Sequence, residues 1–523
     1  MSKVLSTEEL AKIETIADFG AHNKQNRTMT SIARLHAGDK VLVGQQIVEV
    51  SADFAGSIED GDVVLGIASS GALKRIPAAT HALVVDGVLK ASEAFAQLSL
   101  CADSAINSFF GSAADLLSDD SVFDLIATAN AADVASARSR GRSTTRLVLS
   151  SKMRSDMVAA FRMWRDLELA RETKISEVVH DGWTVEQWRA PLGVLGFVFE
   201  GRPNVFADAT GVLKSGNVVV FRIGSDALAT ARAIMTNIIT PSLKKAGLPE
   251  NAVVLLDSPE HAAGWSLFSQ KQLALAVARG SGSAVAELGS IAQQSGISVS
   301  LHGTGGAWMI VGEKCDSARL ASVVEHSLDR KVCNTLNTIC VPRSRVAELV
   351  PTILDASHRA GRTRGHAPRI HAVNGIEDYV SSQEQVTVVR DAKDVVERQI
   401  TSAPLSSVGE EFEWEENPEF AIVLVDSISH AVELFNRYSP QFVISCVSED
   451  VEEVDFVWRH ANAPFVGDGF TRWVDGQFAL LRPELGLSNW ETGRLFARSG
   501  ILSGDSAFTV RLRVSQADKD LHR

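Results

Sequence analysis

The sequence predicts an α/β protein whose central element is a doubly wound parallel sheet. Strand-like runs such as VLGFVFE, NVVVFRIG and NAVVLLDS alternate with the helical stretches DATGVLKSG and ALATARAIMTNIITPSLKKAG. Alternating strands and helices are typical of βαβ units and a parallel sheet. A second α/β stretch runs from about residue 297 to 466, and 523 residues are enough for two or three domains.

Composition narrows the class of protein. The formal net charge is −13 and no basic tract offsets it, which argues against nucleic acid as a partner. The five cysteines have neither a CxxC pair nor metal-type spacing with histidine, so we expect free thiols, a reducing compartment and no metal. The start of the chain lacks the apolar run of a signal peptide, and no segment is apolar over the length of a membrane span. We therefore expect a cytoplasmic protein without a membrane partner.

The first 85 residues differ in sequence pattern from the rest of the chain and are predicted to be an extension of unknown role. An amphipathic helix is expected at the start of the chain. It is followed by DKVLVGQQIVEVSADFAG, DGDVVLGIASSG and HALVVDGVL, whose β-branched residues and Gly/Asp turns predict a small sheet. No catalytic signature lies there, and a packing or oligomer-contact role is the simpler interpretation.

Helical spacing begins near Leu89 and continues through ATANAADVASARSRG. The segment EVVHDGWTVEQWRA then predicts a hairpin, within about residues 169 to 188, that turns at Asp181-Gly182. Further on, the strand ALAVAR leads through a Gly-rich turn into the helix SAVAELGSIAQQ.

Several motifs resemble the γ-glutamyl phosphate reductases (glutamate-5-semialdehyde dehydrogenases), a branch of the aldehyde dehydrogenase superfamily. They are PLGVLG, EGRPNV, KSGN and RIGSDA, then AGLPENAVVLLD, DRKVCNTLNTICV and GFTRWVDGQFALLRPELGLSNWETGRLFARSGI. They occur in family order and cover roughly residues 90 to 515. One such motif is weak evidence, whereas the ordered set is specific.

The resemblance implies an aldehyde dehydrogenase-like fold with a nicotinamide cofactor domain at 86–300 and a catalytic domain at 301–466. The segment 467–523 is then expected to return to the cofactor domain. Its strand AFTVRLRV would join the hairpin in an oligomerisation arm, because an exposed strand edge is otherwise a liability. A homodimer or homotetramer follows as an expectation.

The same resemblance assigns the catalytic roles. Cys333 would be the nucleophile, since a thiolate attacks carbonyl groups well and forms a thioester. Asn204 would donate its side-chain amide to the developing oxyanion. The alternatives are a buried structural cysteine and a turn asparagine after Pro203.

The cofactor is expected to be NADP or NAD. The resemblance places Arg222 and Ser225 at the adenosine ribose and its phosphate, and an arginine suits a 2′-phosphate. The turn Gly280-Ser281-Gly282 would hold the pyrophosphate at a helix start. Glu413 aligns with a glutamate that contacts the nicotinamide ribose. A surface arginine, a plain turn and a solvated acidic loop are the competing interpretations.

The chain departs from the family pattern in two places. SLHGTGGAW puts His302 or Gly303 where most of the superfamily has a general-base glutamate. Reductases of acyl phosphates also lack that glutamate, because activated water would destroy the thioester. The second departure is on the substrate side, where DRKVCN replaces RPSVCN, ARGS replaces PRGG and AWMIVGE replaces CHxYVD.

The residues expected to meet an anionic substrate are Arg330, Lys331 and Arg472, the first two also explicable as a solvated turn. The predicted activity is NAD(P)H-dependent reduction of an acyl phosphate, glutamyl phosphate-like, to a semialdehyde, as in proline biosynthesis. An acyl-CoA reductase or a dehydrogenase of another semialdehyde is the main alternative. A non-catalytic paralogue, and an active enzyme whose extension docks a partner, also stay open.

Overall fold

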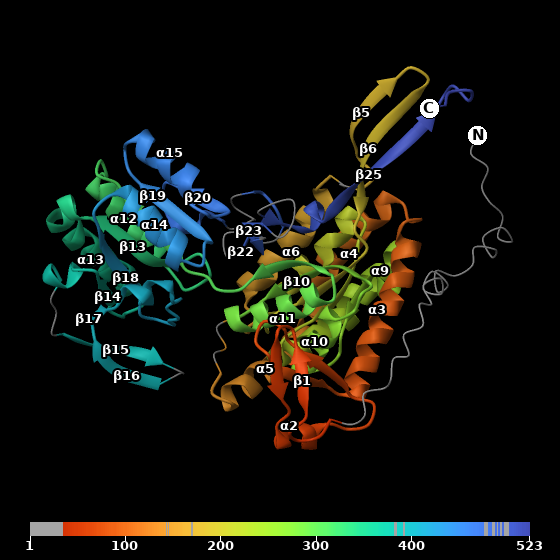
Figure 1. The fold of residues 1–523 in the computed structure, drawn as a ribbon, viewed down its shortest axis with the longest axis horizontal. Coiled ribbons are helices and arrows are strands. Elements are labelled where there is room, and N and C mark those ends of the chain that lie inside the picture. Colours follow the sequence, from red (N-terminus) through yellow and green to blue (C-terminus); the bar gives the residue numbers. More distant parts are fainter. Residues whose placement is uncertain are drawn as a thin grey trace.

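The computed structural model describes residues 35–522 apart from 143, 145, 169–170, 381–383, 391–392, 475–479, 484–486, 489, 492–493 and 496–500. The amphipathic helix predicted at the start of the chain lies outside the described residues. Figure 1 shows two α/β lobes, with a narrow arm projecting from the larger one. No helix among the described residues is long and apolar enough to cross a membrane.

The larger lobe contains a five-stranded parallel sheet in the order β11-β10-β7-β8-β9. Its strands are β7 (Val194–Val198), β8 (Val218–Arg222), β9 (Val253–Leu255), β10 (Leu273–Arg279) and β11 (Ser298–His302). The chain starts in the middle, winds to one edge and then to the other, which makes the sheet doubly wound. The predicted α/β fold with a doubly wound parallel sheet is confirmed.

Helices cover both faces of this sheet, and β7 and β8 are therefore buried along their whole length. They are α3 (Ala78–Leu98), α4 (Asp103–Ser118), α5 (Asp120–Ser139), α6 (Ser151–Asp166), α7 (Val205–Gly211), α8 (Leu228–Ile234), α9 (Thr240–Ala246), α10 (His261–Phe268) and α11 (Gly282–Gln294). The helices and the strands share one hydrophobic core.

The long helix predicted after β8 is not a uniform α-helix. A π-helical stretch, Met235–Ile239, separates α8 from α9. Pro241 lies in the first turn of α9 and has no N–H to donate to the preceding turn. The wider π turn is the usual way a helix accommodates such an interruption.

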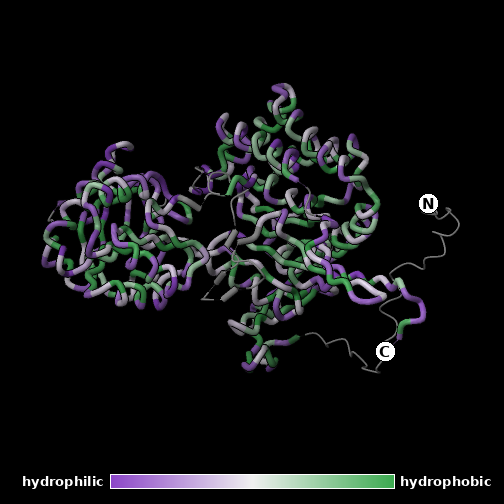
Figure 2. The backbone as a smooth tube through the Cα atoms, turned by 90° about the horizontal axis from the view of Figure 1, so that it is seen from above, coloured by the Kyte–Doolittle hydropathy of each residue, from purple (hydrophilic) through white to green (hydrophobic). Residues whose placement is uncertain are grey.

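The smaller lobe contains a seven-stranded parallel sheet in the order β17-β14-β18-β13-β12-β19-β20. Its strands are β12 (Ala307–Val311), β13 (Leu336–Pro342), β14 (Arg369–Val373), β17 (Ile400–Ala403), β18 (Glu419–Val425), β19 (Val443–Val447) and β20 (Phe465–Gly467). Helices α12 (Ser317–Ser327) and α13 (Val346–Arg362) cover one face, and α14 (Ile428–Tyr438) and α15 (Val451–His460) cover the other. Hydrophobic segments run through the interior of both lobes in Figure 2.

The projecting arm is an antiparallel three-stranded sheet in the order β25-β6-β5. Its strands are β5 (Lys174–His180), β6 (Trp183–Pro191) and β25 (Phe508–Gln516), and Gly182 supplies the positive φ of the turn between the first two. Phe508 pairs with Pro191, so the distant segment AFTVRLRV does lie beside the hairpin. The role of this arm in oligomerisation stays a prediction.

The structure corrects two predictions for the N-terminal extension, because ADFAG and HALVVDGVL, both predicted to belong to a small sheet, are helical. Four short strands form two hairpins, β1 (Lys40–Val43) with β2 (Gln46–Glu49) and β3 (Val63–Gly66) with β4 (Leu73–Ile76), and the short α2 (Ala52–Ser57) lies between them. HALVVDGVL, however, is helical and belongs to α3, so its assignment to the sheet was wrong. Val84, Val88 and Ala91 recur at helical spacing and are fully buried, which outweighs the β preference of valine. Elsewhere, β15 (Gln385–Arg390) and β16 (Lys393–Arg398) form a hairpin, as do β22 (Trp490–Glu491) and β23 (Arg494–Leu495). The strands β21 (Leu487–Ser488) and β24 (Ile501–Leu502), on either side of the second hairpin in the chain, pair antiparallel with each other.

Candidate active site

Cys333 lies in a tight loop immediately before β13. The Thr335 hydroxyl fixes this loop, since its Oγ1 accepts from the Val332 amide (2.8 Å) and donates to the Arg330 carbonyl oxygen (2.6 Å). The Cys333 carbonyl oxygen accepts from the Gly306 amide at 2.7 Å. No described residue accepts a hydrogen bond from the Cys333 amide. The half-exposed thiol is therefore held rigidly, beside a backbone donor that a ligand can use.

Contacts from later segments reinforce the loop. Thr471 donates through its hydroxyl to the Asn334 carbonyl oxygen at 2.8 Å, and its own amide donates to the Ser327 hydroxyl at 2.9 Å. Arg364 donates to the carbonyl oxygens of Leu328 and Asp329, just before the nucleophile. The loop is thus tied to the smaller lobe on both sides of Cys333.

Asn204 is the N-cap residue of α7, in the loop that follows β7. Asn204 lies in a turn, in keeping with the alternative of a turn asparagine, and its side chain makes no capping hydrogen bond to the helix. The loop is pressed against the chain after β8, because a Cβ at Gly224 would lie 2.7 Å from the Gly201 amide nitrogen. Its neighbour Arg202 lies close enough to Cys333 for the two charges to interact. The structure thus places Arg202, two residues before Asn204, in the vicinity of Cys333.

Arg202 is a site residue that the sequence interpretation missed. Burial, together with the charges of Arg279 and Arg146, lowers the pKa of its guanidinium, while the charge of Cys333 opposes that shift. Its Nη2 contacts Glu200, and its buried Nε has no partner among the described residues. A guanidinium in this position can stabilise negative charge near the sulfur.

Arg279, at the carboxyl end of β10, forms a buried ion pair with Asp208 of α7. Each side chain is about nine-tenths buried, and a buried pair of this kind fixes the position of both elements. In the sequence, Arg279 is the arginine of ARGS, and the difference from the family's PRGG does not by itself indicate this ion pair. Its geometric role is to anchor the start of α7 beneath the Asn204 loop.

His302 ends β11, near the place of the superfamily's general base. Burial, with the positive charges of Arg279 and Arg202, lowers the pKa of its imidazole to about 3. Its ring packs edge-on against Phe442 of the smaller lobe, with centroids 5.0 Å apart. A side chain at Gly303 would be crowded, because its Cβ would lie 3.0 Å from Gly282 Cα. The position therefore holds a neutral imidazole and a glycine.

The three residues predicted to meet an anionic substrate differ in their surroundings. Arg330 is exposed and has no ion-pair partner among the described residues. Lys331 is nearly buried and forms an ion pair with Glu411. Arg472 is mostly buried and pairs with Asp329. Of the three, Arg330 is the one whose charge is not already matched by a carboxylate within the described chain.

Glu411 is a second residue that the sequence interpretation missed. Its Oε2 accepts from the Gly305 amide at 2.5 Å, and its Oε1 holds Lys331. A Cβ at Gly305 would lie 2.6 Å from Cys333 Cα and 2.7 Å from Glu411 Oε1, so the glycine allows the carboxylate to approach the nucleophile. Glu413 is 68% exposed, and its Oε1 lies 3.9 Å from Lys331 Nζ. Of the two glutamates, Glu411 has the direct contacts with the nucleophile's surroundings.

The residues at the carboxyl edge of the five-stranded sheet fit a dinucleotide. Arg222, the last residue of β8, is buried, and burial lowers its pKa; its Nη2 donates to the Pro259 carbonyl oxygen at 3.3 Å. Its buried Nε has no partner, and no described carboxylate lies within ion-pair distance. A buried cation without an anion suits a bound phosphate. Ser225 opens the short 3₁₀ helix Ser225–Ala227 that follows, and it is half-buried.

The predicted phosphate turn lies between β10 and α11. Ser281 does not cap α11 with its side chain, which leaves backbone amides of the first turn available to an anion. A Cβ at Gly280 would meet no atom within 4 Å, so the turn faces open space. Gly282 packs against Thr304, since a Cβ there would lie 2.1 Å from Thr304 Oγ1. This turn follows β10 and Arg222 ends β8, the two strands on either side of β7, so both lie at the carboxyl edge of the sheet, where dinucleotides bind in doubly wound folds.

Residues 67–372 match the aldehyde dehydrogenase family. The chain belongs to this family, whose members are oxidoreductases that use NAD or NADP.

Among solved structures, the γ-glutamyl phosphate reductase of Thermotoga maritima is similar, with 22% identity and a TM-score of 0.70 over 84% of this chain and 100% of that one. An engineered glycolyl-CoA reductase with bound NADP⁺ has 15% identity and a TM-score of 0.56 over 84% and 98%. The propionaldehyde dehydrogenase of Rhodopseudomonas palustris with bound propionyl-CoA has 15% identity and a TM-score of 0.55 over 83% and 94%. At these identities the likeness establishes the shared fold.

Proposed function

We propose that this protein reduces an acyl phosphate to a semialdehyde through a thioester on Cys333, with NADPH as the reductant. A glutamyl phosphate-like substrate is the first candidate, on the motifs shared with γ-glutamyl phosphate reductases. The observation that carries the proposal is the pairing of a rigidly held thiol with a neutral His302 where a water-activating carboxylate would be expected.

In the proposed mechanism the Cys333 sulfur attacks the carbonyl carbon of the acyl phosphate. The carbon–oxygen bond to the phosphate then breaks, and phosphate leaves with the electron pair, so that a thioester remains. The amide of the Asn204 side chain and the Cys333 backbone N–H stabilise the negative charge that develops on the carbonyl oxygen. Arg202 and the exposed Arg330 provide positive charge for the departing phosphate.

When bound, NADPH would supply the hydride for the thioester carbonyl carbon. The resulting hemithioacetal oxyanion lies against the same two donors. Its collapse breaks the carbon–sulfur bond, which releases the semialdehyde and restores the Cys333 thiolate. Arg222 and Ser225 would hold the adenosine ribose and its phosphate, the turn 280–282 the pyrophosphate, and Glu411 the nicotinamide ribose.

The His302 position supports reduction over hydrolysis. An imidazole with a pKa of about 3 is a poor acceptor of a proton from water. The Phe442 ring packed on it also limits access of solvent. A thioester on Cys333 is therefore protected until it is reduced.

The test of this function runs the reaction in reverse and varies the acyl acceptor. Glutamate-5-semialdehyde and NADP⁺ are incubated with the protein in the presence of inorganic phosphate, of coenzyme A, or of neither, and formation of NADPH is followed. We expect turnover that requires phosphate. A requirement for coenzyme A would support the acyl-CoA reductase instead. If the rate without any acceptor equals the rates with phosphate and with coenzyme A, the thioester is hydrolysed by water, and the reductase assignment is overturned.

Glu411 and Glu413 offer a matched pair of variants for the nicotinamide end. Glu411→Gln is expected to raise KM for NADP⁺ by about tenfold, because a carboxylate that can accept from ribose hydroxyls becomes a weaker acceptor. Glu413→Gln should change it by less than about twofold, since that side chain lies mostly in solvent. Initial-rate kinetics of both variants give these KM values. A larger rise of KM in Glu413→Gln than in Glu411→Gln would favour Glu413 as the contact of the nicotinamide ribose.

A further inference from the structure

The N-terminal extension packs against the two helices that border the proposed cofactor site. Gln294, the last residue of α11, connects to the turn after β3. Its Nε2 donates to the Gly66 carbonyl oxygen at 2.8 Å, and its Oε1 accepts from the Ala68 amide at 2.9 Å. These two hydrogen bonds fix the β3–β4 hairpin on the end of α11.

Lys74 on β4 connects the extension to both helices at once. Its Nζ lies 2.8 Å from Glu287 Oε2 of α11 and 4.7 Å from the ring centroid of Trp265 on α10. Both partners of the ion pair are about three-quarters buried, so solvent screens the pair only in part. The lysine therefore bridges α10 and α11 from outside the doubly wound sheet.

The contact continues along α10 into the first turn of α3. The Thr80 hydroxyl donates to the Glu260 carboxylate just before α10, and the His81 Nδ1 lies 2.9 Å from the Ser266 hydroxyl. The extension thus follows α10 from its start to its middle.

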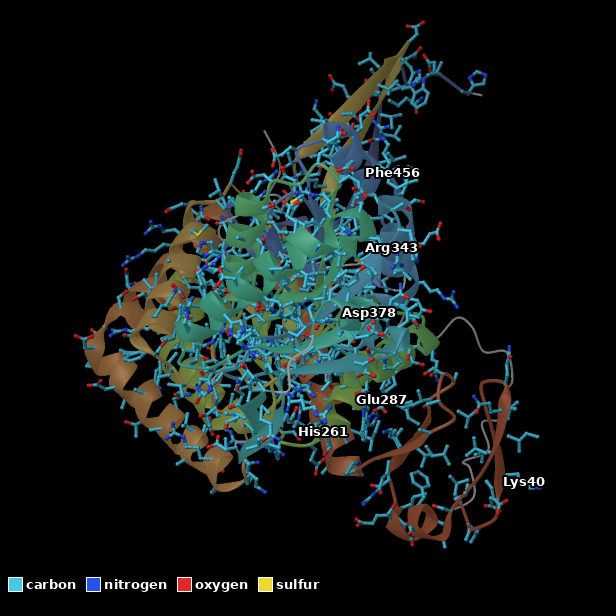
Figure 3. All side chains as sticks on the ribbon, turned by 90° about the vertical axis from the view of Figure 1, so that its left-hand side faces the viewer. Lys40, His261, Glu287, Arg343, Asp378 and Phe456 are labelled. Carbon is cyan, nitrogen blue, oxygen red and sulfur yellow. The ribbon has the colours of Figure 1, made fainter. Side chains whose placement is uncertain are left out.

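Both helices begin at the carboxyl edge of the sheet, where the cofactor is expected. The first residue of α10, His261, lies within the electrostatic influence of Arg222 and Lys74, as well as Arg142 and Glu287. Figure 3 shows His261 and Glu287 near one another on the larger lobe, whereas Lys40 lies on the outer edge of the extension. Lys74 and the buried Arg222 thus approach the same region from two different parts of the chain.

We propose that strand β4 of the extension forms one wall of the adenosine end of the cofactor site, and that Lys74 is a specificity-determining residue for a 2′-phosphorylated adenosine. The inference rests on the proposed function, because that function supplies the ligand. Lys74 is paired with Glu287, and Arg142 shares Asp226 with Arg140. Arg222 has no carboxylate within ion-pair distance among the described residues. A 2′-phosphate near Arg222 would compete with Glu287 for Lys74, so Lys74 would favour the phosphate and Glu287 would oppose it.

The experiment measures binding of two fragments, 2′,5′-ADP and 5′-AMP, to the full-length protein by isothermal titration calorimetry. The fragments differ only in the 2′-phosphate. Lys74→Ala is expected to weaken 2′,5′-ADP by about fivefold and 5′-AMP by less than about twofold. Lys40→Ala is the matched control on the same extension, and it should leave both affinities unchanged.

Glu287→Gln gives a test of opposite sign. Freed from its ion pair, Lys74 should bind 2′,5′-ADP about threefold more tightly, an outcome that loosening of the extension would not produce. Unchanged or weaker binding of 2′,5′-ADP in Glu287→Gln, or an unchanged affinity in Lys74→Ala, would overturn the role of Lys74.

Arg222→Met separates this inference from the proposed function. If this variant weakens 2′,5′-ADP while Lys74→Ala does not, the NADP assignment stands and the role of the extension fails. If Arg222→Met leaves 2′,5′-ADP binding intact, the proposed preference for NADP fails, and the role of Lys74 fails with it.

Discussion

The Cys333→Ala variant is expected to lose phosphate-dependent NADP⁺ reduction by about four orders of magnitude or more, because no thioester can form without the sulfur. Binding of 2′,5′-ADP should be unchanged, since the nucleophile lies in the smaller lobe. The measurement is the steady-state rate with glutamate-5-semialdehyde, phosphate and NADP⁺.

Cys101→Ala is the matched control for this variant. Its half-buried thiol lies between α3 and α4 and donates to the carbonyl oxygens of Gln97 and Gly247. The control should keep the wild-type rate. Retention of more than about a tenth of that rate in Cys333→Ala would contradict covalent catalysis at this residue. Mass spectrometry after incubation with acetyl phosphate adds a direct readout, an acyl adduct on Cys333 that the alanine variant lacks.

The second large effect is expected from Asn204→Ala. Loss of one oxyanion donor typically lowers kcat by about 10²–10³-fold, and KM should change little because the interaction strengthens mainly in the transition state. Asn204→Asp keeps the shape of the side chain but places negative charge near the oxyanion, so its kcat should fall at least as far.

Thermal unfolding distinguishes this role from a structural one. A helix-capping residue contributes about 1 kcal/mol to stability, but the Asn204 side chain makes no cap bond. The melting temperature of Asn204→Ala should therefore match that of the wild type. A clear loss of stability together with an unchanged kcat would show that Asn204 supports the loop and takes no part in catalysis.

The strands and helices of the larger lobe could be predicted because pattern and tertiary structure agree there. NVVVFR and ALAVAR are β-branched or apolar runs that the fold buries on both faces. HALVVDGVL was misread for the opposite reason, since its valines favour strands locally while their burial follows helical spacing. Gly87 permits that helix to pack closely, as a Cβ there would lie 3.1 Å from Leu256 Cδ2. Such a long-range contact has no local signal.

The residues of the candidate site also fall into two groups, those that a local motif indicates and those that depend on tertiary contacts. Cys333 and Asn204 were assigned from motifs that are continuous in sequence, and their catalytic roles stay predictions. The proximity of Arg202 to Cys333, and of Glu411 to Gly305, depends on how loops from distant strands meet, so spacing alone does not reveal it. Glu411 and Glu413 also lie two residues apart in an acidic run, and the sequence does not indicate which carboxylate turns inward. The ion pair between Lys331 and Glu411 could not be predicted because the sequence does not show which of the two glutamates turns inward.

The pairing of β25 with β6 also has a consequence for the order of events during synthesis. β6 emerges from the ribosome roughly 300 residues before its partner, so one of its edges has no strand beside it while most of both lobes is translated. Pairing over such a distance along the chain is slow, and an open edge in that interval invites wrong pairings between nascent chains. The neighbouring strand β5 exposes Ile175, Val178 and Val179, so apolar side chains are also available for such contacts in that interval. Completion of the arm therefore comes late, after the loops that carry Asn204 and Cys333 have been translated.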